Sequence, residues 1–327
     1  MIHCFCYEEE GSDRLDRFLA RSLPGITRSQ IRRLILTGHV SLNGKQAKAG
    51  ARLRPHDRVE VCIPPSPPSP LRPEPIPLDV LHEDPWILVL NKPAGLVVHP
   101  GPGHASGTLV NALLAHSPGL ESVGGPQRAG LVHRLDKGTS GVMVVGKTDA
   151  AQRDLARQFK ERSVEKVYVA LVHGRPRGPS GTIRLPLGRD PRDRQRISTR
   201  TRTPRTAITR WEVVKGFSHC ALLRVRPETG RTHQIRVHLA AIQHPVVGDL
   251  LYGSRSRSRQ IPGKEIQQAL LGASRQLLHA ESLALHHPHW GERRTFQAPF
   301  PTDLVEILSF LESGRREKFD KPGKPEV

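Results

Sequence analysis

Residues 131–146 read LVHRLDKGTSGVMVVG, and this stretch decides how the rest of the chain is interpreted. An apolar, strand-like approach ends at Asp136, a polar loop over 137–141 follows, and a second apolar run completes the segment. Rigid elements on both sides of a loop are how a scaffold aims a reactive group. The segment therefore predicts one carboxylate at a strand end beside Arg134 and Lys137. By residue type alone, a structural aspartate that pairs with Arg134 or caps the following loop is the commoner interpretation.

The charge balance indicates a polyanionic partner. The 327 residues carry 50 Lys and Arg against 31 Asp and Glu, a formal net charge of +19. A field of this sign favours nucleic acid first and an anionic membrane second, although a generally basic proteome would give the same composition. The length favours two domains, and a hydrophobic content of 36% is enough for an ordinary core.

The cysteines and the apolar pattern predict a cytoplasmic protein. The four cysteines are too scattered for a zinc finger or a disulfide framework, so we expect free thiols. The first ten residues lack the basic start and apolar core of a signal peptide, and no apolar run approaches the length of a membrane span. We therefore expect no membrane association.

A proline-rich segment divides the chain. Residues 64–77 contain eight prolines in fourteen positions, which is typical of an extended, semi-rigid spacer. A proline-motif ligand is the less common alternative. The spacer separates a small domain over 13–63, preceded by an N-terminal extension over 1–12, from a large domain over 78–312. Residues 313–327 are polar and contain proline and glycine, so we expect a disordered tail.

The small domain is basic and compact. Apolar residues at helical spacing predict helices near 15–19 and 31–35, and Asn-Gly at 43–44 predicts a hairpin. Eleven Lys and Arg stand against four Asp and Glu in this domain. The layout resembles the alpha-L RNA-binding module, named for a small-subunit ribosomal protein. RNA contacts are therefore expected for residues on or beside the second helix, where a solvated basic face is the alternative: Arg28, Arg32 and Arg33.

The large domain mixes strands and helices without a strict strand–helix–strand repeat. This pattern predicts an α+β fold with a central sheet that is mostly antiparallel or mixed. The elements expected from apolar runs and helical spacing are strands at 80–84, 86–90, 166–172 and 219–225, and helices that include 151–159 and 235–242.

Residues 141–148 match the phosphate-loop expression G-x-x-x-x-G-K-[ST], but their chemistry argues against it. A phosphate loop needs some left-handed backbone, which Val142, Val144 and Val145 avoid because they are β-branched. We interpret them as a buried strand and expect no nucleotide cofactor.

No metal site is expected either. The 17 histidines include no H-E-x-x-H motif and no cysteine and histidine quartet at zinc spacing. His286, His287 and His289 cluster in a loop-like segment, which we interpret as solvated.

Four segments of the large domain carry the resemblance of this chain to a known family. Residues 133–141 read HRLDKGTSG, and residues 91–100 read NKPAGLVVHP. The first resembles the signature of the RluA/RluD-type pseudouridine synthases, and the second resembles the upstream motif of that family. Residues 166–174, KVYVALVHG, resemble its tyrosine strand, and 229–239, TGRTHQIRVHL, resemble its arginine helix, with HPVVGD following at 244–249. With the N-terminal module, the resemblance covers nearly the whole chain in the layout of the bacterial large-subunit rRNA enzymes.

The resemblance implies an enzyme that isomerises uridine to pseudouridine in RNA, with 23S rRNA as the expected substrate and no cofactor. It implies that Asp136 is the nucleophile, that Arg236 is its ion-pair partner, and that Tyr168 stacks on the uracil and can move a proton. Attack on the sugar and addition to the ring are both open to the carboxylate. A surface Arg236 and a core Tyr168 are the structural alternatives. The family often has aspartate where Gly138 stands; this loop position leaves the nucleophile in place.

A base inside a helix cannot reach Asp136, so we expect the target nucleotide to flip into a pocket. Arg134 is a candidate to fill the gap or to hold a phosphate. Residues 189–210 carry eight arginines against two aspartates, and either grip RNA or form a solvated loop. A tRNA substrate and a non-catalytic RNA-binding or ribosome-assembly factor are the alternative functions. The candidate RNA contacts in the arginine-rich segment are Arg192, Arg194 and Arg196.

Overall fold

The computed structural model divides the chain into two units, Met1–Pro68 and Ser69–Val327, with the boundary inside the proline-rich segment 64–77. Within the described residues, no helix is both long and apolar enough to cross a bilayer. The residues that the structure describes are 2–23, 26, 28–48, 50–64, 71–101, 103–125, 128–193 and 196–319.

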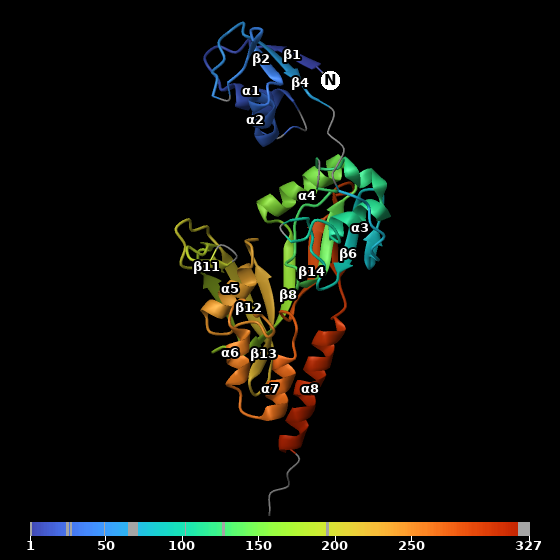
Figure 1. Cartoon of the computed structure of the whole chain (residues 1–327), viewed down its shortest axis with the longest axis vertical. Helices are drawn as coiled ribbons and strands as arrows, with labels where there is room; N and C mark the ends of the chain where they lie inside the picture. The colour runs from blue at the N-terminus through green and yellow to red at the C-terminus, as the bar shows by residue number, and fades with distance from the viewer. Residues whose placement is uncertain are drawn as a thin grey trace, which may run out of the picture. The chain divides into compact units, whose positions relative to one another are not determined.

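The smaller unit is a four-stranded antiparallel sheet with two helices (Figure 1). Its elements are β1 (Ile2–Cys6), α1 (Leu15–Ser22), α2 (Arg28–Leu36), β2 (Val40–Leu42), β3 (Lys45–Gln46) and β4 (Arg58–Cys62). The strand order is β1-β4-β2-β3, and both helices share one apolar core with β4, which includes Ile35 and Val61. The treatment of residues 1–12 as an extension is corrected here, because Ile2 pairs with Cys62 and β1 is an edge strand of the sheet.

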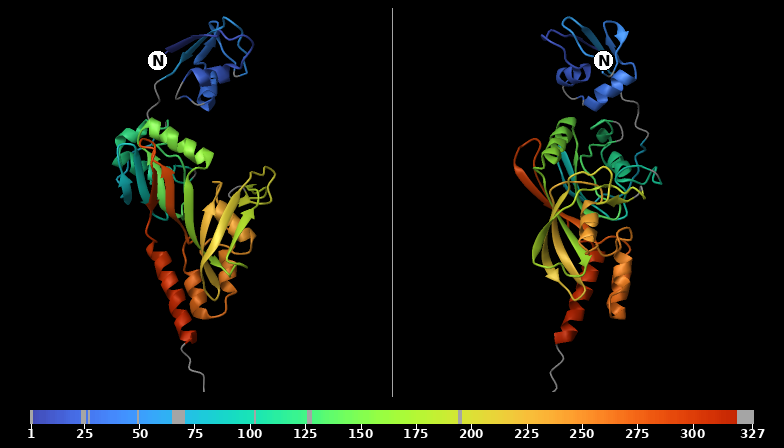
Figure 2. Two further views of the ribbon diagram at one scale, coloured as in Figure 1. Left: turned by 180° about the vertical axis from the view of Figure 1, so that it is seen from behind. Right: turned by 90° about the vertical axis from the view of Figure 1, so that its left-hand side faces the viewer.

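The larger unit is built on a nine-stranded mixed sheet (Figures 1 and 2). Its elements are β5 (Val80–Glu83), β6 (Ile87–Lys92), α3 (Leu109–His116), a 3-10 turn (Pro118–Glu121), β7 (Ser140–Gly146), α4 (Asp149–Glu161), β8 (Glu165–His173), β9 (Ser180–Arg184), β12 (Ile208–Gly216), β13 (Cys220–Pro227), α5 (Gln234–Ala241), α6 (Ser254–Arg259), α7 (Lys264–Leu271), β14 (Leu278–His286), β15 (Arg293–Gln297) and α8 (Thr302–Phe319). A separate hairpin consists of β10 (Gly188–Arg189) and β11 (Ile197–Ser198).

The strand order is β5-β6-β7-β14-β8-β13-β12-β9, with β15 paired to β14. Only β7 and β14 run parallel among these pairs, so the α+β prediction with a mostly antiparallel sheet is confirmed. Alternate side chains of β6 and β7 face α3 on one side of the sheet and α4 on the other. In the second half of the sheet, α5 packs on one face and α7 and α8 on the other.

The approach to Asp136 differs from the expected strand. Leu131 forms a single bridge to Val145, and residues 132–136 have no regular structure. His133 holds this segment in place, because its Nε2 accepts the backbone N–H of Val144 over 3.0 Å. The apolar run after the loop is the buried strand β7, as expected, and it leaves no phosphate loop at this position.

Two further expectations are corrected. The helix α8 continues to Phe319, so the first part of the predicted disordered tail is helical; residues 320–327 lie outside the described residues. His287 is buried, not solvated, and its Nε2 lies 3.0 Å from Oδ2 of Asp84. This contact joins the β14–β15 turn to the β5–β6 turn.

Candidate active site

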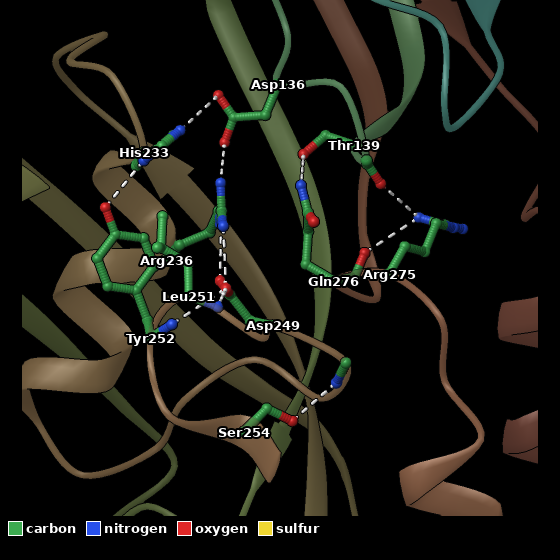
Figure 3. Close-up of polar contacts among 12 residues, drawn as sticks. Asp136, Thr139, His233, Arg236, Asp249, Leu251, Tyr252, Ser254, Arg275 and Gln276 are labelled. Carbon is green, nitrogen blue, oxygen red and sulfur yellow. Dashed lines mark hydrogen bonds and ion pairs between the residues drawn. The ribbon is translucent and has the colours of Figure 1, made fainter. Parts of the chain in front are cut away.

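Asp136 and Arg236 form an ion pair (Figure 3). Asp136 lies in the loop before β7, and Arg236 lies in the first turn of α5. The Nη1 atom of Arg236 donates to Oδ2 of Asp136 over 2.9 Å. On its other edge, Nε and Nη2 donate to the two carboxylate oxygens of Asp249 over 2.6 and 2.9 Å. One guanidinium therefore bridges two carboxylates, of which Asp249 is fully buried and Asp136 is 21% exposed.

The surroundings of Arg236 keep it charged. Burial lowers the pKa of the guanidinium, but the hydrogen bond and charge of Asp249, together with the charge of Asp136, outweigh burial and raise the pKa. The guanidinium also lies over the Tyr252 ring, 5.1 Å from its centre. Arg236 is thus a fixed positive charge and not a proton donor.

The Asp249 carboxylate is held by its own loop. Its Oδ1 accepts the backbone N–H groups of Leu251 and Tyr252 over 3.1 and 3.3 Å. The hydroxyl of Ser254 accepts the N–H of Gly248, where φ is +78° and a Cβ would lie 1.8 Å from the carbonyl oxygen of Arg275. Only glycine fits this close approach.

A buried lysine anchors the loop that follows Asp136. Lys92 is fully buried, and its Nζ donates to the carbonyls of Pro93, Leu96 and Lys137 over 2.7, 2.9 and 3.3 Å. Burial, with the charge of Arg275 acting in the same direction, lowers the pKa of Lys92 to about 8. Lys92 therefore joins the end of β6 to the Asp136 loop.

The other side of this loop contacts the segment before β14. Arg275 donates to the carbonyl of Gly138 over 3.0 Å, and Gln276 donates to the Thr139 hydroxyl over 3.2 Å. A Cβ on Gly138 would lie 2.5 Å from Oε1 of Gln276. Glycine at this position therefore leaves the space that the Gln276 side chain fills.

Tyr168 and Asp136 line the same cavity, which has a volume of about 480 Å3. Tyr168 lies on β8, at the middle of the sheet, opposite Val225 on one neighbouring strand and Ala280 on the other. Burial and the charge of Asp136 raise the pKa of its hydroxyl, so the phenol keeps its proton. A second hollow, of about 810 Å3, shares Asp136 and Arg236 with the first.

The cavity wall carries cations without carboxylate partners. Among the described residues, none of these cations has an ion pair within 4 Å: Lys160, Arg162, Lys166, Arg134 and Arg231. The acidic residues beside them are paired with other arginines, namely Glu161 with Arg157, Glu165 with Arg293 and Glu228 with Arg210. The exposed Arg134, expected to pair with Asp136 or to contact RNA, lines both hollows.

The basic candidates in the smaller unit differ in their contacts. Arg28 binds Asp16, whose pKa is lowered to about 2 by hydrogen bonds from Arg14 and Arg28 despite its burial. Arg32 and Arg33 are exposed on α2. All three arginines are exposed, and Arg28 differs because its guanidinium is paired with Asp16.

The arginine-rich segment 189–210 includes the β10–β11 hairpin. Arg192 is exposed, and Arg194 lies outside the described residues. Arg196 points inward, since its Nη2 donates to the carbonyl of Leu251 and its guanidinium lies 5.7 Å from the centre of the Tyr252 ring.

Comparison with known proteins identifies the family. Residues 86–241 match the model of RNA pseudouridylate synthase, and residues 13–59 match that of the S4 domain. An "Uncharacterized RNA pseudouridine synthase" from Aquifex aeolicus (strain VF5) is 45% identical over 94% of this chain and 96% of its own. The chain belongs to the RNA pseudouridylate synthase family. It is therefore an enzyme of the isomerase class whose substrate is RNA, and the resemblance read from the sequence is confirmed.

Other members of the family support this assignment. The "Ribosomal large subunit pseudouridine synthase D" of Pasteurella multocida (strain Pm70) is 40% identical over 92% of this chain and 91% of its own. Among solved structures, the "Human RNA Pseudouridylate Synthase Domain Containing 4" has 27% identity and a TM-score of 0.55, over 72% of this chain and 93% of that one. The pseudouridine synthase fold is thus shared.

Sequence reasoning missed three residues of the site. Asp249 and Lys92 both lie in segments that resemble motifs of the family, but the sequence predicted no role for either residue. His233, whose Nε2 lies 3.9 Å from Oδ1 of Asp136, was not singled out. The signal available for Asp249 was an acidic residue directly after an apolar run and a glycine, a pattern that suits a buried turn.

Proposed function

We propose that this protein converts uridine to pseudouridine in large-subunit rRNA, with Asp136 as the nucleophile. The bond between N1 of uracil and C1′ of ribose breaks, the base turns, and a bond forms between C5 and C1′. C5 loses a proton and N1 gains one, so the reaction is redox-neutral and its balance needs no cofactor. The observation that carries the proposal is the Arg236–Asp136 ion pair beside Tyr168 in one cavity.

The charges assign different roles to the three side chains. Arg236 compensates the charge of Asp136 and stays protonated, because its pKa is raised. Tyr168 also keeps its proton, which favours stacking of its ring on the uracil over action as a base at neutral pH. Asp136, partly open to the cavity, is then the group that reacts.

We further propose that the cavity wall binds the RNA backbone. Lys160, Arg162 and Lys166 line the cavity, and the neighbouring Glu161 and Glu165 are paired with other arginines. Cations without partners in a hollow favour phosphate groups, which gain charge-assisted hydrogen bonds there. A nucleotide that flips toward Asp136 brings its flanking phosphates to such a wall.

The rRNA target is supported by relatives that are named for the large ribosomal subunit and by the S4 match. Pseudouridine mapping in total RNA tests it, in cells that lack the gene and in the same cells carrying the wild type or Asp136→Asn. We expect a site in large-subunit rRNA to disappear and only the wild type to restore it. Loss of a pseudouridine in tRNA instead would contradict the proposed rRNA target. Restoration of the site by Asp136→Asn would contradict the assignment of Asp136 as the nucleophile. Fractionation of the tagged protein tests the cytoplasmic location that we also propose.

A further inference from the structure

His233 faces the oxygen of Asp136 that Arg236 does not bind. Its Nε2 lies 3.9 Å from Oδ1 of Asp136, whereas Arg236 donates to Oδ2 (Figure 3). His233 precedes α5 and has φ of +54°, a left-handed conformation that costs a non-glycine residue energy and that is concentrated at functional sites. The spacing is longer than a hydrogen bond, and catalytic hydrogen bonds often tighten only in the complex with substrate.

The contacts of the Tyr252 hydroxyl indicate which nitrogen of His233 carries the proton. The Tyr252 oxygen accepts the backbone N–H of Ile197 over 3.0 Å and lies 2.8 Å from Nδ1 of His233. A backbone N–H can only donate, so the hydroxyl keeps its own hydrogen for another partner. The acceptor that the Tyr252 oxygen contacts is Nδ1 of His233. The neutral imidazole then carries its proton on Nε2, on the side of Asp136.

The geometry points to His233 as a positioning residue for Asp136: Tyr252 fixes the imidazole as the Nε2–H tautomer, which presents a hydrogen-bond donor to Oδ1. The two oxygens of the nucleophile are then oriented by two different donors, Arg236 and His233. This inference rests on the proposed function for its kinetic consequence, but not for the tautomer itself.

The charges around His233 are consistent with a neutral ring. Burial lowers the pKa of the imidazole, and the charges of Arg236 and Arg134 act in the same direction. The charges of Asp136 and Asp249 oppose them without reversing the direction. At neutral pH the ring therefore donates from one nitrogen only, and the identity of that nitrogen matters.

The same contacts connect the arginine-rich hairpin to the site. Ile197 belongs to β11, and its neighbour Arg196 also contacts the Tyr252 ring and the carbonyl of Leu251. The N–H that occupies the Tyr252 oxygen is therefore supplied by this hairpin.

Nitrogen NMR of histidine-labelled, full-length protein without RNA tests the tautomer directly. The His233 signals are assigned by their loss in His233→Gln. We expect Nε2–H in the wild type and in Tyr7→Phe, which removes a tyrosine hydroxyl from the smaller unit. In Tyr252→Phe we expect a mixture of tautomers. Nδ1–H in the wild type, or an unchanged tautomer in Tyr252→Phe, would overturn the inference.

Single-turnover kinetics on an rRNA substrate provides the second readout. Tyr252→Phe is expected to slow the reaction by roughly tenfold, about the value of one hydrogen bond, without changing the RNA Kd. In His233→Gln the amide keeps a donor toward Asp136 but loses the link to Tyr252, so adding Tyr252→Phe is expected to cost nothing more. Additive effects of the two changes would overturn the inference. An inactive wild type would contradict the proposed function alone, because the NMR result needs no RNA.

Discussion

The guanidinium of Arg236 lies 2.9 Å from the carboxylate of Asp136, although the two residues are 100 positions apart in the chain. Arg236 lies in the first turn of α5, and Asp136 lies in the loop before β7. A third residue, Asp249, holds the opposite edge of the guanidinium. This arrangement fixes where the positive charge points.

The buried carboxylate of Asp249 is expected to be essential for that orientation. Asp249→Ala leaves the buried edge of Arg236 without an acceptor, and breaking a buried pair costs roughly 3 kcal/mol or more of unfolding free energy. Urea unfolding measures this loss. The matched control is Glu161→Ala, which removes an exposed ion pair with Arg157 and should cost less than about 1 kcal/mol. Equal losses in the two variants would contradict the role of Asp249.

Lys92 predicts a pH dependence of stability. Its pKa is lowered from 10.5 to about 8 in the folded protein, so between these values the unfolded chain binds the proton and the folded chain does not. The sign is therefore a gain: the free energy of unfolding rises with pH across this window, by up to about 3 kcal/mol for this group. The measurement is the difference between the wild type and Lys92→Met, whose site does not titrate. If the free energy of unfolding changed with pH in parallel in the two proteins, the lowered pKa of Lys92 would be refuted.

Gly138 stands where the family often has aspartate. We expect the effect of a substitution at Gly138 on stability to depend on the side chain of Gln276. Gly138→Ala places a methyl group against the Gln276 side chain and should cost roughly 1 kcal/mol of stability. Gln276→Ala removes the obstacle, so the double variant should be more stable than the sum of the two single changes predicts. A double-mutant cycle by thermal or urea unfolding measures the coupling, and strict additivity would show that the two side chains do not compete.

Much of this architecture could be predicted from the sequence because it is local. The run 142–145 is wholly apolar and rich in β-branched valine, which identifies β7. Apolar residues at helical spacing identify α5. In contrast, β1 is an edge strand with three of its five side chains exposed and none fully buried, so its apolar pattern is weak. The short segment before Asp136 is apolar without being a strand, since His133 and not a ladder of backbone hydrogen bonds holds it.

The contacts of the site were less accessible to sequence reasoning. Resemblance to family motifs predicted that Asp136, Tyr168 and Arg236 belong to one site. No local sequence pattern shows that Asp249 binds the same guanidinium of Arg236 as Asp136 does. Contacts between segments far apart in the chain depend on the tertiary fold. His287 shows the same limit, because its burial depends on Asp84, which lies about two hundred positions earlier.

Loss of a cation from the cavity wall should change how strongly the affinity for RNA depends on salt concentration. Arg162→Gln should weaken RNA binding and lower the slope of log affinity against log salt by about 1, the value for one lost phosphate contact. Arg157 lies on α4, the helix that ends directly before Arg162, but it is paired with acidic residues, so Arg157→Gln should leave the slope unchanged. Filter binding over a range of salt concentrations measures both. Identical slopes for Arg162→Gln and the wild type would contradict a phosphate contact.

The central claim is that Asp136 is the nucleophile, and tritium release from rRNA labelled at C5 of uridine tests it most directly. Forming the bond between C5 and C1′ releases the C5 hydrogen to water, so each turnover is counted. Asp136→Asn preserves the size of the side chain but removes its charge. We predict no release above background with an RNA Kd like that of the wild type. Release by Asp136→Asn at a rate near that of the wild type would contradict the assignment.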